Sequence, residues 1–134
     1  MKYQKIDFNR IDNDEFYNLV ENTTKDWVLE QCLENATPEQ CEYLAEFGEI
    51  DKITMMFVQK LLPIATPEQC KFLAEFGKTN EIAMMFAKKL LPNATYNKCK
   101  HLTKCGKTDK IKQMFKNKLK ELDEKEEPYY KQFL

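Results

Sequence analysis

A tandem repeat of 29 residues dominates the sequence and restricts the chain to a small set of folds. Residues 36–64 (ATPEQCEYLAEFGEIDKITMMFVQKLLPI) recur as residues 65–93 with 19 of 29 positions identical. Residues 94–122 form a third copy, which matches the second at 13 of 29 positions. Because the units of such a repeat bury their apolar faces against one another, the period predicts a stack of similar supersecondary units.

Each repeat has the pattern of two helices. Thr37-Pro38-Glu39-Gln40 combines an N-cap, a proline at N1 and a capping-box glutamine, and residues 66–69 repeat this start. The second helix of the first repeat is expected over residues 51–62, ending at Pro63. The three glycines are expected to end the first helices in the left-handed conformation; they are Gly48, Gly77 and Gly106.

Residues 1–35 align with the same period as a degenerate N-terminal hairpin, and residues 123–134 form an acidic and aromatic C-terminal tail. The sequence therefore predicts an all-α protein, an α-solenoid of three to four helical hairpins. In the third repeat Gln113, Lys116 and Lys120 stand where the first has Met55, Val58 and Leu62. A polar outer face is what a terminal repeat needs, so residues 94–122 are expected to cap the stack.

Residues 66–91 combine a Thr-Pro start, the Leu73-Ala74 pair, Gly77 and an Ile-rich helix that ends in Leu-Leu. Over these residues and their copies, the chain resembles ankyrin repeats. The resemblance implies a helical-repeat scaffold that binds partners. The period of 29 is shorter than the roughly 33 residues of that family. It leaves no room for the β-turn finger of an ankyrin repeat, and no functional residue is carried over.

Composition argues against several enzyme classes. The chain has no serine, one histidine and three glycines, which excludes a serine nucleophile, a histidine-rich metal site and a glycine-rich phosphate loop. Cys99, His101 and Cys105 are close in sequence, but 99 and 105 point to different faces of one helix and a further ligand is not evident. All five cysteines are expected in the core, Cys105 because it aligns with Phe76. We therefore expect no enzyme activity, no cofactor and no metal.

The net charge of −1 conceals a strong gradient along the chain. Residues 1–50 carry a net charge of −8 and residues 94–120 a net charge of +8. Equivalent helix positions change sign from repeat to repeat. The leading hypothesis is a protein-interaction module that uses this surface, with the C-terminal aromatic residues as a second contact. The candidate residues are Glu42, Lys71, Lys100, Glu49, Lys78, Lys107, Tyr129, Tyr130 and Phe133.

A small inhibitor encoded by a phage or mobile element is a special case of that hypothesis, and head-to-tail self-association is another use of the gradient. The alternative function is nucleic-acid binding by the third repeat. Its candidate residues are Lys98, Lys100, Lys104, Lys107, Lys112, Lys116 and Lys120. The near-absence of arginine weighs against this alternative.

The tail leaves three alternatives open: it folds back over the third repeat, it docks elsewhere as a peptide, or it is partly ordered. No secretory signal is visible and no apolar stretch approaches the roughly 18 residues of a membrane span. Five cysteines without such a signal fit reduced thiols, so a cytoplasmic location is expected and a membrane partner is not.

Overall fold

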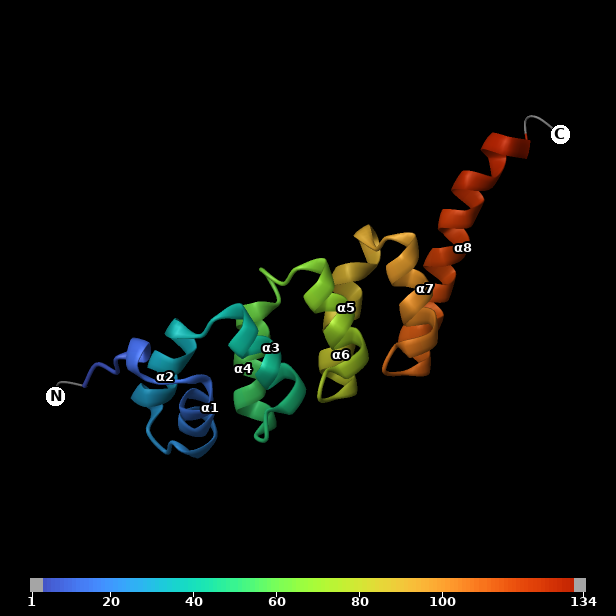
Figure 1. Ribbon diagram of the computed structural model, residues 1–134. Helices are drawn as coiled ribbons and strands as arrows, with labels where there is room; N and C mark the ends of the chain where they lie inside the picture. The colour runs from blue at the N-terminus through green and yellow to red at the C-terminus, as the bar shows by residue number, and fades with distance from the viewer. Residues whose placement is uncertain (1–3, 132–134) are drawn as a thin grey trace. The chain divides into compact units, whose positions relative to one another are not determined.

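The computed structural model describes the backbone of residues 4–131 and the side chains of residues 4–124. Within these residues the chain is all-helical, and its α-helices pack in sequence-adjacent pairs (Figure 1). The pairs fall into two compact units, residues 1–65 (unit 1) and residues 66–134 (unit 2), which are treated separately below.

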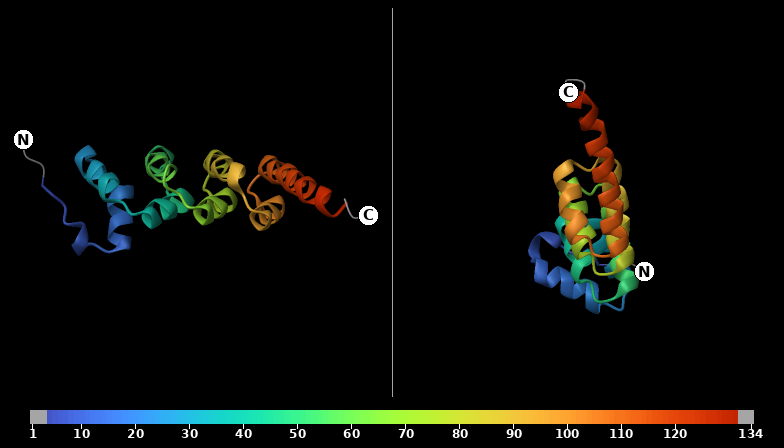
Figure 2. Two further views of the ribbon diagram at one scale, coloured as in Figure 1. Left: turned by 90° about the horizontal axis from the view of Figure 1, so that it is seen from above. Right: turned by 90° about the vertical axis from the view of Figure 1, so that its right-hand side faces the viewer.

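Unit 1 contains a short 3₁₀ turn and two helical hairpins: η1 (Phe8–Arg10), α1 (Asn13–Asn22) with α2 (Asp26–Asn35), and α3 (Pro38–Phe47) with α4 (Asp51–Leu61). Unit 2 also contains two hairpins: α5 (Pro67–Phe76) with α6 (Asn80–Leu90), a 3₁₀ turn η2 (Leu91–Asn93), and α7 (Tyr96–Cys105) with α8 (Asp109–Lys131). In unit 2, α5 packs against α6 and α7 packs against α8, and the right-hand view of Figure 2 shows α7 and α8 side by side.

The core of unit 1 joins its two hairpins through aromatic and aliphatic side chains. Phe16 of α1 meets Phe57 of α4 edge to face, with ring centroids 6.3 Å apart. Both rings are fully buried, as is Leu61 one turn further along α4. The ammonium of Lys60 donates hydrogen bonds to the carbonyls of Leu33 and Glu34 in the last turn of α2. This lysine therefore satisfies helix-end carbonyls that have no partner within α2.

The core of unit 2 is likewise built from buried phenylalanine and leucine side chains. Phe86 of α6 and Phe115 of α8 are fully buried, together with Leu73 of α5 and Leu102 of α7. A backbone hydrogen bond of 3.0 Å, from the Lys107 N–H to the Ala74 carbonyl, ties the end of one hairpin's first helix to the next hairpin. Unit 2 therefore has a fixed relation between α5 and α7, on which the site described below depends.

The predicted capping boxes are confirmed. Thr37 accepts a hydrogen bond from the Gln40 N–H at 3.1 Å, and the Gln40 side chain accepts one from the Thr37 N–H at 2.9 Å. Thr66 and Gln69 form the same reciprocal pair in unit 2. Each box satisfies two donors that the first turn of a helix would otherwise leave open.

The expectation of left-handed glycines is wrong. Gly48, Gly77 and Gly106 have φ angles of −55°, −49° and −52°, which any residue adopts. The need for steric room explains why these three positions are glycine. A Cβ on Gly48 would lie 1.9 Å from Thr54 Oγ1, and one on Gly106 would lie 2.7 Å from Ile111 Cγ2. Each glycine lets the second helix of its hairpin approach the end of the first.

Helix α8 continues through residues that the sequence assigned to a tail. The backbone of residues 123–131 extends the helix to Lys131 and does not turn back over the third repeat. Near its start, Ile111 and Phe115 are buried, whereas Gln113 and Lys116 are exposed. The face that was expected to be the polar outer face of the third repeat is therefore solvent-exposed at these two positions.

Candidate functional site

Three aromatic side chains form a continuous strip on the first helices of the unit 1 hairpins. The rings of Tyr17 on α1 and Tyr43 on α3 stack with centroids 4.0 Å apart and planes 18° apart. Phe47, one turn after Tyr43, lies 5.0 Å from it. Tyr43 is 42% exposed and Phe47 is 56% exposed. We call Tyr17, Tyr43 and Phe47 the aromatic strip; exposed aromatic surface of this kind is typical of binding sites.

A shallow cavity of about 220 Å³ opens beside the aromatic strip. Two carboxylates, Glu21 and Glu49, stand at its wall together with the amides of Asn18 and Asn22. The Glu49 backbone N–H donates to both oxygens of the Glu21 carboxylate at 3.2 Å. This bond fixes the Glu21 side chain at the cavity, so the site combines an aromatic surface with fixed negative charge.

Burial and neighbouring groups shift the pKa of two side chains on α1 and α3. Burial first, then the neighbouring Tyr43, raises the pKa of Tyr17, which keeps its phenol neutral. On α3, burial and then the charge of Glu42 raise the pKa of Glu46. The repulsion between Glu42 and Glu46 adds to the negative character of α3.

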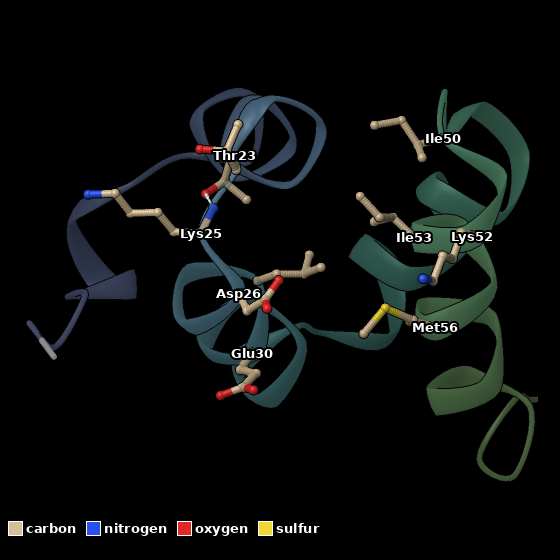
Figure 3. A pocket seen from close by; sticks show the side chains of 10 residues that line it. Thr23, Lys25, Asp26, Glu30, Ile50, Lys52, Ile53 and Met56 are labelled. Carbon is tan, nitrogen blue, oxygen red and sulfur yellow. Dashed lines mark hydrogen bonds between the residues drawn. The ribbon is translucent and has the colours of Figure 1, made fainter.

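A second cavity in unit 1, of about 440 Å³, lies between the α1–α2 connection and α4 (Figure 3). Ile50, Ile53 and Met56 line it on one side, and Asp26 and Glu30 of α2 line it on the other (Figure 3). The Lys25 N–H donates to Thr23 Oγ1 at 3.1 Å and shapes the connection. This cavity presents apolar side chains opposite carboxylates, but it lacks the ordered aromatic surface of the strip.

Unit 2 carries a different constellation at corresponding helix positions. His101 Nε2 of α7 lies 3.0 Å from Glu75 Oε2 of α5, within hydrogen-bond distance. One ligand atom from each of Glu75, His101 and Cys105 lies within 4.8 Å of the others. Nitrogen, oxygen and sulfur donors at this spacing are those that bind borderline transition metals.

The structure separates the five cysteines into two classes. Cys32, Cys41, Cys70 and Cys99 are buried, and burial raises the pKa of each thiol, to about 11 for Cys32 and Cys41. Cys105 is exposed, so the prediction that it lies in the core is wrong. The aligned Phe76 is itself 47% exposed, which is why alignment to an aromatic position did not indicate burial.

The partner-binding residues predicted from the charge gradient are on the surface to different degrees. Glu49, Lys100 and Lys107 are exposed, and Glu42, Lys71 and Lys78 are half-buried. Of this set, Glu49 belongs to the wall of the cavity beside the strip. The backbone of Tyr129 and Tyr130 belongs to α8, but their side chains, and all of Phe133, lie outside the described residues.

The lysines of the nucleic-acid alternative also differ in their exposure to solvent. Lys100, Lys104, Lys107, Lys116 and Lys120 are exposed. Lys98 is only 18% exposed in its side chain and forms a 2.8 Å ion pair with Glu68. Lys112 is half-buried. A Lys98 ammonium held by a carboxylate is less available to a phosphate than the sequence suggested.

Sequence reasoning missed the aromatic strip and the carboxylate of the mixed-donor cluster. The spacing of Tyr43 and Phe47, four residues apart on one helix, is the signal that would have indicated a shared face. His101 and Cys105 have the same spacing. Glu75 lies 26 positions before His101 and belongs to the preceding repeat, so only the packing of α5 against α7 brings it near.

Comparisons with protein-family models, with curated proteins and with solved structures found no match. Among the described residues no helix has both the length and the apolar character that crossing a membrane would require. The function must therefore be argued from the surface of this chain itself.

Proposed function

We propose that the protein is a non-enzymatic interaction module that binds a basic segment of a partner protein at the aromatic strip of unit 1. The observation that carries this proposal is the aromatic strip, in which half-buried Tyr17 stacks on exposed Tyr43, beside the carboxylate of Glu21 that a hydrogen bond holds in place. An aromatic surface and negative charge together favour the side chain of arginine or lysine.

The chemistry of such a contact follows from the side chains. A guanidinium or ammonium group placed over an aromatic face is attracted by the ring, and a contact of this kind contributes roughly 0.5–1 kcal/mol at an exposed site. The Glu21 carboxylate accepts a single shared backbone N–H, that of Glu49, and still has lone pairs for a charged donor. A preordered site of this type loses little side-chain entropy when the partner binds.

The charge of the surrounding sequence supports the same class of partner. Residues 1–50 carry twelve acidic and four basic side chains. A field of this sign accelerates the encounter with a basic segment, an effect that salt screens. Binding is therefore expected to weaken as ionic strength rises.

The proposed architecture is an α-solenoid of three to four hairpins with the 29-residue repeat. The paired helices and the reciprocal caps at Thr37 and Thr66 support it, as does the change to polar residues on the α8 face. Solenoids present extended binding surfaces. The charged positions Lys71, Lys78, Lys100 and Lys107 belong to unit 2 and are a separate candidate contact for acidic segments of a partner.

The test uses the full chain and a short peptide of alternating glycine and arginine, with a glycine and glutamate peptide as a control. Titration calorimetry at low salt should detect the arginine peptide only. Phe47→Ala should weaken binding about two- to fivefold, which corresponds to the loss of one exposed cation–π contact. Phe76→Ala is the matched control, because Phe76 is the aligned and similarly exposed residue of unit 2.

Equal binding of both peptides, or an equal effect of the two phenylalanine variants, would contradict the assignment to the strip. Sedimentation of the chain alone tests whether the partner is a second copy of this chain. A salt-sensitive dimer that Phe47→Ala removes would place the strip in a contact between two copies, for which residues 94–120, with a net charge of +8, are the expected basic segment.

A further inference from the structure

We propose that Glu75, His101 and Cys105 form a binding site for a transition-metal ion, with Zn²⁺ as the ion that the donors fit best. The three side chains offer one oxygen, one imidazole nitrogen and one sulfur within 4.8 Å of one another. This site lies in unit 2 and is independent of the proposed protein-binding strip of unit 1.

The fold holds two of these donors on one helix. His101 and Cys105 are separated by one turn of α7, so their side chains share a face. In the aligned pair of α5, Phe72 and Phe76, the ring centroids lie 5.0 Å apart, which shows that residues at this spacing converge. The third repeat thus replaces two converging aromatic rings by two converging metal donors.

The third donor is delivered by packing between hairpins. Glu75 belongs to α5, and its carboxylate lies 3.0 Å from His101 Nε2. The adjacent backbone is fixed, because the Ala74 carbonyl accepts a 3.0 Å hydrogen bond from the Lys107 N–H. A second tie, the 2.8 Å ion pair of Glu68 with Lys98, holds the opposite ends of the two helices. The carboxylate is therefore positioned by the fold before any ion arrives.

The spacing fits a tetrahedral ion after small rotations of the side chains. Zinc bonds of about 2.0–2.3 Å to oxygen, nitrogen and sulfur place tetrahedral ligand atoms roughly 3.3–3.8 Å apart. The present separations are 3.0 Å for the carboxylate and imidazole and at most 4.8 Å within the cluster. Cys105 is exposed, so its side chain has room to rotate toward this distance.

Charge and protonation also balance. Zinc binding displaces the Cys105 thiol proton into water and uses an unprotonated ring nitrogen of His101. The thiolate and the Glu75 carboxylate then neutralise the two positive charges of the ion. This local neutrality offsets the repulsion from nearby lysines such as Lys104. Three protein ligands leave one tetrahedral position for water or a donor from outside the chain.

Exposure makes Cys105 the cysteine suited to this role. The other four cysteines are buried, so their thiols are not accessible to an ion from solution. Cys99 is on the same helix as His101, yet it is fully buried and faces the core. A metal at this helix therefore uses Cys105 and not Cys99.

The test titrates the tag-free, reduced full chain with Zn²⁺ in competition with a chromophoric chelator. We expect one equivalent to bind, and Co²⁺ in its place to give a sulfur-to-metal charge-transfer band. His101→Phe and Cys105→Phe restore the aromatic residues of the preceding repeat, so they should fold normally. Each should weaken Zn²⁺ binding at least tenfold, and Cys105→Phe should remove the charge-transfer band.

Glu75→Gln should also weaken binding, whereas Glu81→Gln, at an exposed carboxylate of the same unit, is the matched control. Alkylation followed by mass spectrometry gives a second readout, in which Zn²⁺ should protect the single reactive thiol of the native chain. Absence of stoichiometric binding, or binding that survives both phenylalanine variants, would overturn the proposal, as would a Co²⁺ spectrum without a sulfur band.

Discussion

The rings of Tyr17 and Tyr43 stack 4.0 Å apart, at the sequence positions that Glu75 and His101 occupy two repeat lengths later. Both pairs join the first helices of neighbouring hairpins within one unit. In unit 1 the pair gives an aromatic surface, and in unit 2 it gives a carboxylate beside an imidazole. One structural position thus carries two different pairs of side chains, and both of our functional proposals depend on it.

Gly48→Ala should destabilise the protein by about 2–3 kcal/mol, because overpacking of a tight contact has costs of this size. The new Cβ would lie 1.9 Å from Thr54 Oγ1 and 2.6 Å from the Leu44 carbonyl. Urea unfolding measures the change. The φ of −55° is ordinary, so the cost is steric and not torsional.

The double variant Gly48→Ala/Thr54→Ala tests how much of the lost stability comes from the contact with the Thr54 hydroxyl and how much from the contact with the Leu44 carbonyl. Thr54 Oγ1 is buried without a hydrogen-bond partner among the described residues, and fully buried Ala83 is the aligned residue of unit 2. Thr54→Ala alone should therefore change stability by less than about 1 kcal/mol, since it removes an unsatisfied hydroxyl. It should also recover part of the loss caused by Gly48→Ala. Strictly additive effects would contradict the steric explanation.

Lys60→Met should cost about 1 kcal/mol of stability. The Lys60 ammonium caps the last turn of α2 at the Leu33 and Glu34 carbonyls, and the apolar stem of methionine cannot replace those hydrogen bonds. Lys52→Met, at an exposed position of the same helix, is the control. Thermal unfolding of both variants compares them directly, and an equal shift in Tm would argue against the cap.

Stability should fall as the pH rises from about 9 toward 11. Burial raises the pKa of the Cys32 and Cys41 thiols from 9.0 to about 11, so the folded state retains protons that the unfolded state releases over this range. A folded-state pKa above the unfolded value contributes stability at low pH and loses it at high pH. The slope of unfolding free energy against pH should be smaller in a Cys32→Ala/Cys41→Ala variant. An unchanged slope would mean that other groups cause the loss of stability at alkaline pH.

Much of the local structure could be predicted from the sequence because each signal acts over a few residues. The Thr37 and Thr66 caps, the proline at N1 and the apolar spacing of Phe57 and Leu61 are all local determinants. The role of the glycines could not be predicted in this way. Their necessity comes from the side chains of Thr54 and Ile111, whose positions depend on how the hairpin closes.

The candidate sites were harder to predict because their partners are separated by about one repeat. Tyr17 and Tyr43, like Glu75 and His101, are 26 residues apart, and no local pattern links them. Exposure was the second difficulty. Aromatic residues repeated at one helix position suggested a core, yet Phe47 and Phe76 are 56% and 47% exposed.

The nucleic-acid alternative makes its own prediction. The short Lys98–Glu68 ion pair removes one cation from the set, and arginine is absent from residues 94–120. We therefore expect no binding of single- or double-stranded DNA or RNA at about 50 mM salt, measured by fluorescence anisotropy. Binding that weakens with salt and is lost in a Lys100→Glu/Lys107→Glu variant would favour the alternative.

The central claim is that unit 1 recognises a basic protein segment at the aromatic strip, and an NMR titration tests it most directly. The ¹⁵N-labelled full chain is titrated with the short arginine and glycine peptide described above. Our account predicts shift changes concentrated in α1 and α3, at Tyr17, Tyr43, Phe47 and Glu49, with little change at Phe72 and Phe76. Changes confined to unit 2, or none at saturating peptide, would contradict it.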